Sequence, residues 1–267
     1  MPIEYEKQDH LAWITINRPQ ALNALDIESF REMRNRLMEV RDDKDVRVIL
    51  ITGAGEKAFC AGADIKGTLP TLGGFLENYY KPVSESIDEG LYIRGIDIAS
   101  LQIWKPIIAV VNGYAMGGGF ELALACDLRI ASTNAVFALP EVKIGSIPAV
   151  GGIQNLNRAA PSAIAMKMIL TGESIDANTA LQYGIVSDVA EPAKLRETAE
   201  RIARRIADNA PLAVRTAKLL SEMGRNMPAG QAIEMEKFLW GLLKDTEDRI
   251  EGRKAFAEKR KPVYKGK

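Results

Sequence analysis

The sequence predicts an α/β fold that ends in a helical unit. In the larger, N-terminal part, short strand-like segments alternate with segments whose apolar residues repeat at helical spacing. This alternation is typical of helices layered on a sheet. From Ala193 onward the pattern is almost entirely helical. We therefore expect an α/β core over residues 1–192 and a C-terminal helical region over residues 193–267.

The N-terminal elements are predicted in the order strand, helix, strand. Residues 11–17 alternate and are rich in β-branched side chains, as expected of a strand. Asp26 is a suitable N-cap for a helix over residues 27–41, since its carboxylate can accept hydrogen bonds from the first turn. Residues 46–52 are mostly apolar, which is typical of a strand buried on both faces. A loop is predicted over residues 53–68. The apolar face of the helix comprises Phe30, Met33, Leu37 and Val40.

The middle of the chain continues this alternation. Residues 69–104 have a weaker pattern, which is predicted to end in a helix before Lys105. The other core elements are a buried strand at 107–112, a helix opened by the glycines at 117–119 and reaching about Cys126, short strands at 128–131 and 136–138, and a helix opened by Gly151 and Gly152. In the C-terminal region, Pro211 and Pro228 stand where new helices can begin, because proline is tolerated in a first helical turn.

The composition excludes several classes of protein. Lys plus Arg and Asp plus Glu both number 35, so the net charge is zero and no basic nucleic-acid-binding surface is expected. Two cysteines and one histidine are too few for a disulfide framework or a thiolate zinc site, and we expect no metal. The N-terminus lacks a secretory signal pattern, and no apolar run approaches the ~20 residues of a membrane-spanning helix. We therefore expect a cytoplasmic protein that does not bind membranes.

Two glycine-rich loops imitate nucleotide-binding motifs. Gly53 and Gly55 follow a predicted strand, as in a dinucleotide fingerprint, but no helical pattern follows them. Gly62 and Gly67 have the spacing of a phosphate-binding loop, but the lysine that this motif needs before Thr68 is missing. We interpret both loops as turns.

Three segments carry residues that predict chemistry: residues 58–66, 112–123 and 139–148. The glycines of the second segment precede a predicted helix, where unpaired N–H groups and the helix dipole favour negative charge. Glu121 would lie in the first turn of that helix, and Glu141 lies in the third segment. Each feature alone also fits a turn, a helix start or an exposed acid, whereas the three together are more specific.

In this order and spacing, AFCAGADIK, NGYAMGGGFELA and LPEVKIGSIP resemble the enoyl-CoA hydratase (crotonase) superfamily. The resemblance extends over nearly the whole chain. It implies a spiral of strand–strand–helix (ββα) units with a C-terminal helical trimerisation region. It also implies an acyl-CoA thioester substrate and assembly as a homotrimer or homohexamer. No separate cofactor is implied, because coenzyme A is part of the substrate.

The resemblance also implies roles for individual residues. The backbone N–H groups of Ala61 and Gly118 would form an oxyanion hole for the thioester carbonyl. Glu121 and Glu141 match two glutamates that hold the attacking water in the hydratase branch. Neighbouring carboxyls can differ in protonation, because like charges raise one pKa. We interpret Glu121 as the base that activates water and Glu141 as the acid that protonates Cα, although the pair is better defined than the assignment within it.

A larger set of residues is implied to contact coenzyme A or the acyl group. It comprises Ala21, Leu22, Ala61, Gly62, Ala63, Asp64, Ile65, Lys66, Gly117, Gly118, Phe256 and Lys259. Lys66 would help to neutralise phosphate. Phe256 and Lys259 match a segment that relatives offer to the coenzyme A of a neighbouring subunit. A solvated basic face explains this segment equally well.

The implied reaction is reversible addition of water across the 2,3 double bond of a 2-enoyl-CoA, giving a 3-hydroxyacyl-CoA. The acyl group remains open, because Ala149 replaces the family's usual glycine and residues 67–104 are longer than in common hydratases. One alternative is a hydro-lyase like carnitinyl-CoA dehydratase, in which Tyr79 and Tyr80 would face a trimethylammonium group. Further alternatives are an enoyl-CoA isomerase and a non-catalytic RNA-binding or assembly relative.

Overall fold

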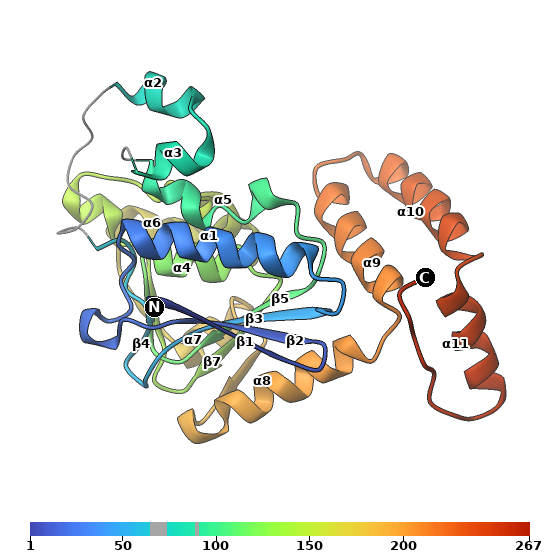
Figure 1. The fold of residues 1–267 in the computed structure, drawn as a ribbon. Helices are drawn as coiled ribbons and strands as arrows, with labels where there is room; N and C mark the ends of the chain where they lie inside the picture. Colours follow the sequence, from blue (N-terminus) through green and yellow to red (C-terminus); the bar gives the residue numbers. More distant parts are fainter. Residues whose placement is uncertain (65–73, 89–90) are drawn as a thin grey trace.

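A six-stranded sheet forms the centre of the fold in the computed structural model, which describes residues 1–64, 74–88 and 91–267 (Figure 1). The strand order is β1-β2-β3-β5-β7-β10. β1 and β2 are antiparallel, whereas the later neighbours are parallel. The strands are β1 (Ile3–Gln8), β2 (Leu11–Ile16), β3 (Val48–Gly53), β5 (Ile107–Val111), β7 (Leu128–Ser132) and β10 (Asp188–Ala190).

A smaller, four-stranded sheet has the order β4-β6-β8-β9. β4 (Ala58–Cys60), β6 (Tyr114–Met116) and β8 (Val136–Ala138) are parallel, and β9 (Ile175–Asp176) is antiparallel to β8. Each of β4, β6 and β8 directly follows a strand of the larger sheet and is followed by helical segments. The chain thus repeats a strand–strand–helix unit, which confirms the expected ββα architecture.

Helices cover both faces of the larger sheet (Figure 1). α1 (Ile27–Asp42) begins at the predicted cap, where the Asp26 carboxylate accepts a hydrogen bond from the Ser29 N–H over 2.9 Å. Its predicted apolar face is buried in the main core. α8 (Pro192–Ala207) packs on the opposite face, where Leu195 and Ala199 join a second cluster with β2 and β3.

The remaining helices are shorter or peripheral. The α-helices are α2 (Phe75–Tyr80), α3 (Val83–Asp88), α4 (Gly118–Leu124), α5 (Gly152–Ala159), α6 (Ser162–Thr171), α7 (Ala177–Gln182), α9 (Pro211–Gly224), α10 (Ala229–Leu243) and α11 (Glu247–Ala257). The 3-10 helices are η1 (Pro19–Ala21), η2 (Tyr92–Ile96), η3 (Ala99–Leu101) and η4 (Glu141–Ile144). No helix in the described part of the chain has the length and apolar character needed to cross a membrane.

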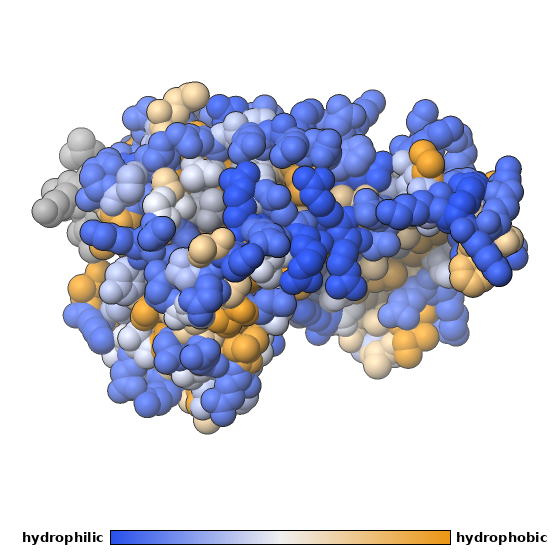
Figure 2. Space-filling view, turned by 90° about the horizontal axis from the view of Figure 1, so that it is seen from below, coloured by the Kyte–Doolittle hydropathy of each residue, from blue (hydrophilic) through white to orange (hydrophobic). Residues whose placement is uncertain are grey.

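The C-terminal region divides between the core and a peripheral unit. α8 is packed on the sheet, whereas α9, α10 and α11 lie together at one side of the molecule (Figure 1). α8 thus packs with the core, although it lies within the predicted C-terminal helical region of residues 193–267. Apolar side chains lie on the surface of the peripheral unit (Figure 2). They include Phe238, Trp240, Leu242, Ile250 and Phe256.

Some elements were not predicted from the sequence. β4 and β6 have only three residues each, and β1 carries several charged side chains, so their strand character depends on partners that are distant in sequence. In the described residues of the 69–104 segment, α2, α3, η2 and η3 replace the single helix that was predicted. Residues 65–73 and 89–90 lie outside the described residues.

Candidate active site

Glu121 stands in the first turn of α4, which begins directly after β6. Two glycines permit this arrangement. Gly117 has a φ of +52°, a conformation that favours glycine. A Cβ on Gly119 would lie 2.0 Å from the Cys60 carbonyl oxygen, so α4 can pack closely on β4 only because this residue is glycine. Glu121 is consequently only 4% exposed.

Backbone N–H groups at the start of α5 hold the Glu121 carboxylate. The Val150 and Gly152 N–H groups donate to its Oε1 over 2.8 and 2.9 Å. Burial raises the pKa of Glu121, and these hydrogen bonds lower it. The donors therefore stabilise the ionised form of a buried carboxylate and fix its orientation. The sequence analysis missed both donors, although Gly151 and Gly152 indicated a helix start with unpaired N–H groups.

Glu141 approaches the same place from η4. A Cβ on Gly117 would lie 3.1 Å from Glu141 Oε1, so this carboxyl group adjoins the start of α4. Its Oε2 is buried and has no hydrogen-bond partner among the described residues. Burial raises the pKa of Glu141 to about 7, and the negative charge of Glu121 contributes in the same direction. The two glutamates thus have different environments, which is typical of an acid–base pair.

The structure changes one member of the predicted oxyanion hole. The Ala61 N–H donates to the Leu22 carbonyl over 3.1 Å, so it is not free to bind a substrate oxygen. The N–H groups of Ala63 and Gly118, in contrast, have no hydrogen-bond partner within residues 1–64, 74–88 and 91–267. Gly118 is the first residue of α4, where a helix leaves N–H groups unpaired. We therefore replace Ala61 by Ala63 as the candidate partner of Gly118.

Ala63 and Gly118 are neighbours in space. A Cβ on Gly118 would lie 4.0 Å from the Ala63 nitrogen, and a Cβ on Gly62 would lie 3.3 Å from the Gly118 nitrogen. Gly62 has a φ of +93°, so the tight turn before Ala63 requires glycine. Two segments that are distant in sequence thus bring two unpaired N–H groups together, as binding of a carbonyl oxygen requires.

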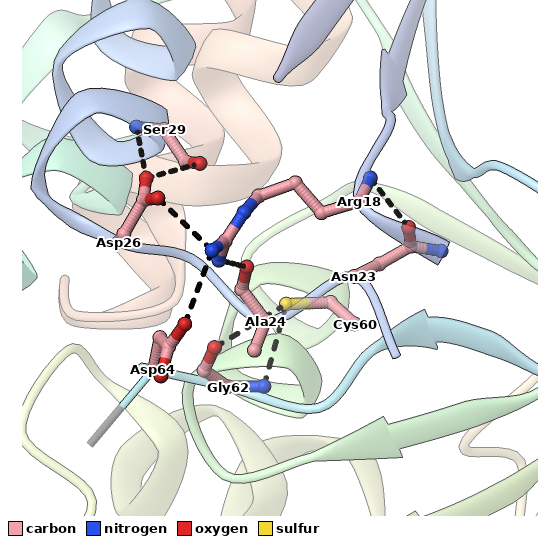
Figure 3. A network of polar contacts seen from close by, with 8 residues as sticks. All are labelled: Arg18, Asn23, Ala24, Asp26, Ser29, Cys60, Gly62 and Asp64. Atoms are coloured by element: carbon pink, nitrogen blue, oxygen red, sulfur yellow. Dashed lines mark hydrogen bonds and ion pairs between the residues drawn. The ribbon is translucent and has the colours of Figure 1, made fainter. Parts of the chain in front are cut away.

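Only some of the residues predicted to contact coenzyme A lie near the Ala63 and Gly118 N–H groups. Ala21 and Leu22 lie beside the segment that carries Ala63, as the bond from Ala61 to Leu22 shows. The Asp64 carboxylate lies 3.1 Å from Arg18 Nη2, which engages it in an ion pair (Figure 3). The predicted contacts Ile65 and Lys66 lie outside the described residues.

The C-terminal candidates lie elsewhere in the chain. Phe256 is 87% exposed near the end of α11, and Lys259 follows that helix. α11 and α4 lie in different parts of the molecule (Figure 1). Within one chain, these two residues therefore do not join the glutamates.

Two neighbouring backbone N–H groups beside one buried and one half-buried carboxyl group fit the class of enzyme that stabilises an oxyanion while protons move. Comparison with known proteins identifies the family. The enoyl-CoA hydratase/isomerase model matches residues 6–267, and this chain belongs to that family. The protein is thus a hydro-lyase with a crotonase fold, in a family that acts on acyl-CoA thioesters.

Individual relatives agree with this assignment. The chain is 48% identical to (E)-benzylidenesuccinyl-CoA hydratase of Thauera aromatica over 266 residues, which is 100% of both chains. It is 41% identical to carnitinyl-CoA dehydratase of Escherichia coli, over 95% of this chain and 94% of that protein. A crystal structure of enoyl-CoA hydratase from Bacillus anthracis matches with a TM-score of 0.89 and 37% identity, over 100% of both chains.

Proposed function

We propose that this protein adds water across the 2,3 double bond of a 2-enoyl-CoA and catalyses the reverse dehydration. The observation that carries the proposal is the pair of glutamates in different environments, Glu121 buried and Glu141 half-buried. Burial raises the pKa of both groups, but Glu121 accepts two backbone hydrogen bonds that oppose the rise, whereas Glu141 has an unpaired Oε2 and a pKa raised to about 7. Addition of water needs a base for the nucleophile and an acid for Cα, and this pair supplies both.

The proposed hydration proceeds through an enolate. The thioester oxygen accepts hydrogen bonds from the Ala63 and Gly118 N–H groups, which stabilise the charge that develops on it. Glu121 takes a proton from water as the water oxygen bonds to Cβ, and the π electrons move towards the thioester oxygen. Glu141 then delivers its proton to Cα as the carbonyl reforms. In this proposal coenzyme A is part of the substrate and no other cofactor takes part.

The proposed roles of the two glutamates predict an alkaline loss of rate in both directions. Hydration needs Glu141 protonated and Glu121 ionised, so its kcat is expected to fall as the pH rises through about 7, the pKa to which burial raises Glu141. Dehydration needs Glu141 ionised and Glu121 protonated, so it also requires one proton on the pair, and its kcat is expected to fall at alkaline pH as well. Initial rates in both directions between pH 5 and pH 9 check this. A dehydration kcat that rises through pH 7 would contradict the assignment.

Gly152→Ala is expected to displace the proposed base. The added Cβ would lie 2.8 Å from Glu121 Cγ and 2.9 Å from its Oε1, which is closer than real contacts allow. We expect kcat to fall by about 10²-fold, the usual cost of misplacing a catalytic group by ~1 Å. Gly230→Ala is the control in steady-state kinetics, because its Cβ meets no atom within 4 Å. Equal kcat values for the two variants would show that turnover does not depend on the position of Glu121.

For the acyl group, we propose an aryl-substituted enoyl thioester with a second carboxylate. The support is the 48% identity, over the whole of both chains, to the relative named for (E)-benzylidenesuccinyl-CoA. The predicted tyrosine receptor for trimethylammonium has less support. Tyr79 and Tyr80 are 54% and 80% exposed, and the Arg94 guanidinium already lies 5.9 Å from the centre of the Tyr79 ring.

Loss of enoyl-thioester ultraviolet absorbance tests both the proposed hydration reaction and the proposed acyl group. We expect the highest kcat/KM with (E)-benzylidenesuccinyl-CoA, compared with crotonyl-CoA and crotonobetainyl-CoA. A preference for either of the other two would retain the hydratase and reject the aryl substrate. A 3-enoyl-CoA converted to its 2-enoyl isomer, with no solvent oxygen incorporated, would instead favour an isomerase. No reaction with any of the four would overturn the proposed function.

We also propose assembly as a homotrimer or homohexamer, with Phe256 and Lys259 reaching the coenzyme A of a neighbouring subunit. The support is the set of large apolar side chains that α10 and α11 expose, because exposed apolar surface can mark an interaction site. Sedimentation velocity of the purified chain measures the state directly. A monomer at micromolar concentration would contradict this proposal.

A further inference from the structure

One guanidinium group connects the two segments that surround the proposed Ala63 donor (Figure 3). Arg18 Nη2 lies 3.0 Å from Asp26 Oδ2 and 3.1 Å from Asp64 Oδ2. Its Nη1 donates to the Ala24 carbonyl. The Arg18 side chain is only 17% exposed, so these pairs are less screened by water than ordinary surface ion pairs.

Leu25 and Ala63 form an isolated parallel β-bridge, and Arg18 contacts residues that flank it in both segments. The Leu25 N–H donates to the Gly62 carbonyl over 2.8 Å, and the Asp64 N–H donates to the Leu25 carbonyl over 2.8 Å. Arg18 contacts the residues on both sides of Leu25 and the residue that follows Ala63. A single side chain thus holds both segments of the bridge.

The bridge determines the direction of the Ala63 N–H. The Gly62 carbonyl and the Ala63 N–H belong to one peptide unit, and in a trans peptide these groups point in opposite directions. Since the carbonyl is bonded to Leu25, the N–H points away from Leu25. A hydrogen bond to the carbonyl also polarises the peptide, which strengthens donation by its N–H.

The base of the same loop is held by a buried amide. Asn23 Oδ1 accepts a hydrogen bond from the Arg18 N–H over 3.0 Å, and its Nδ2 donates to the Ala58 carbonyl over 2.7 Å. Leu22 and Asn23 have φ values of +52° and +56°, which side-chain-bearing residues rarely adopt. These contacts keep the loop in a conformation from which the guanidinium reaches all its partners.

We propose that Arg18, acting through Asp26 and Asp64, is a positioning residue for the Ala63 donor and thereby for stabilisation of the oxyanion. The expected effect of Arg18 on the reaction rate rests on the proposed function. The effect of Arg18 on the orientation of the Ala63 N–H does not. Arg18 contacts no reacting atom in this proposal. Its charge is offset by two carboxylates, so its contribution is geometric.

Arg18→Met tests the proposal, because it removes all the polar contacts and keeps most of the aliphatic chain. The direct readout is the absorption spectrum of bound 4-(dimethylamino)cinnamoyl-CoA, which moves to longer wavelength when its carbonyl accepts hydrogen bonds. We expect a smaller red shift than in the wild type, and kcat reduced by about 10-fold, less than complete loss of one donor costs. KM is expected to change by less than about threefold, since the contact is realised mainly in the transition state.

Two further variants complete the design. Arg18→Lys keeps the positive charge but lacks the planar guanidinium group that contacts several partners at once. An intermediate red shift and an intermediate kcat are therefore expected. Arg204→Met breaks the 3.1 Å ion pair between α8 and Asp9 and is expected to leave both quantities unchanged. A wild-type red shift in Arg18→Met, even with a lower Tm, would overturn the proposal and leave Arg18 a purely structural role. A wild-type protein that shifts the spectrum but adds no water would reject the proposed function instead.

Discussion

Glu121→Gln is expected to lower kcat for hydration by about 10²–10⁴-fold, the range for loss of a general base. Glutamine has the size of glutamate, and its carbonyl oxygen can still accept the Val150 and Gly152 N–H groups. It cannot take a proton from water at neutral pH. The site geometry therefore persists while the chemical step is lost, as loss of enoyl-thioester absorbance would show.

Glu141→Gln is expected to reduce hydration over the same range, because its amide cannot deliver a proton to Cα. Binding of the 3-hydroxyacyl-CoA product, measured by calorimetry, should change by less than about threefold in either variant, since product binding does not require proton transfer. Glu222→Gln is the matched control, because burial also raises the pKa of that glutamate, on α9 away from the site. Full turnover in both site variants would rule out the two-glutamate mechanism.

Gly118→Pro is expected to lower kcat by about 10²–10³-fold, the usual cost of removing one oxyanion-hole donor. Proline lacks the backbone N–H, and the first position of a helix tolerates it, so the substitution removes the proposed donor while α4 can still form. Steady-state kinetics measures the loss, and the circular dichroism spectrum verifies the fold.

Gly118→Ala separates the missing N–H from the added side chain. A Cβ at this position meets Ile96 Cδ1 at 3.6 Å, which is an ordinary contact, and alanine keeps the N–H. We expect Gly118→Ala to retain at least about a tenth of wild-type kcat, because its donor is intact. If alanine and proline reduced kcat equally, crowding rather than loss of a donor would explain the effect.

The elements that could be predicted from the sequence are those with local signals. The Asp26 cap and the apolar spacing of α1 are encoded within one helix, and both are present in the structure. β4 and β6 could not be predicted, because three-residue strands acquire their character from pairing with each other. α8 has a helical pattern, but only its packing on β2 and β3 shows that it belongs to the core.

The candidate site shows the same division. The sequence by itself predicted which segments carry the chemistry, because residue type and order are visible in it, and the resemblance of those segments to the crotonase superfamily predicted that Glu121 and Glu141 act as a pair. Only the tertiary structure decided that Ala63 and not Ala61 offers a free donor, since every residue of that loop has an N–H and the Leu22 carbonyl occupies one of them. Tertiary structure also distinguishes the two glutamates, because burial and hydrogen-bond partners set a pKa and neither can be read from residue order.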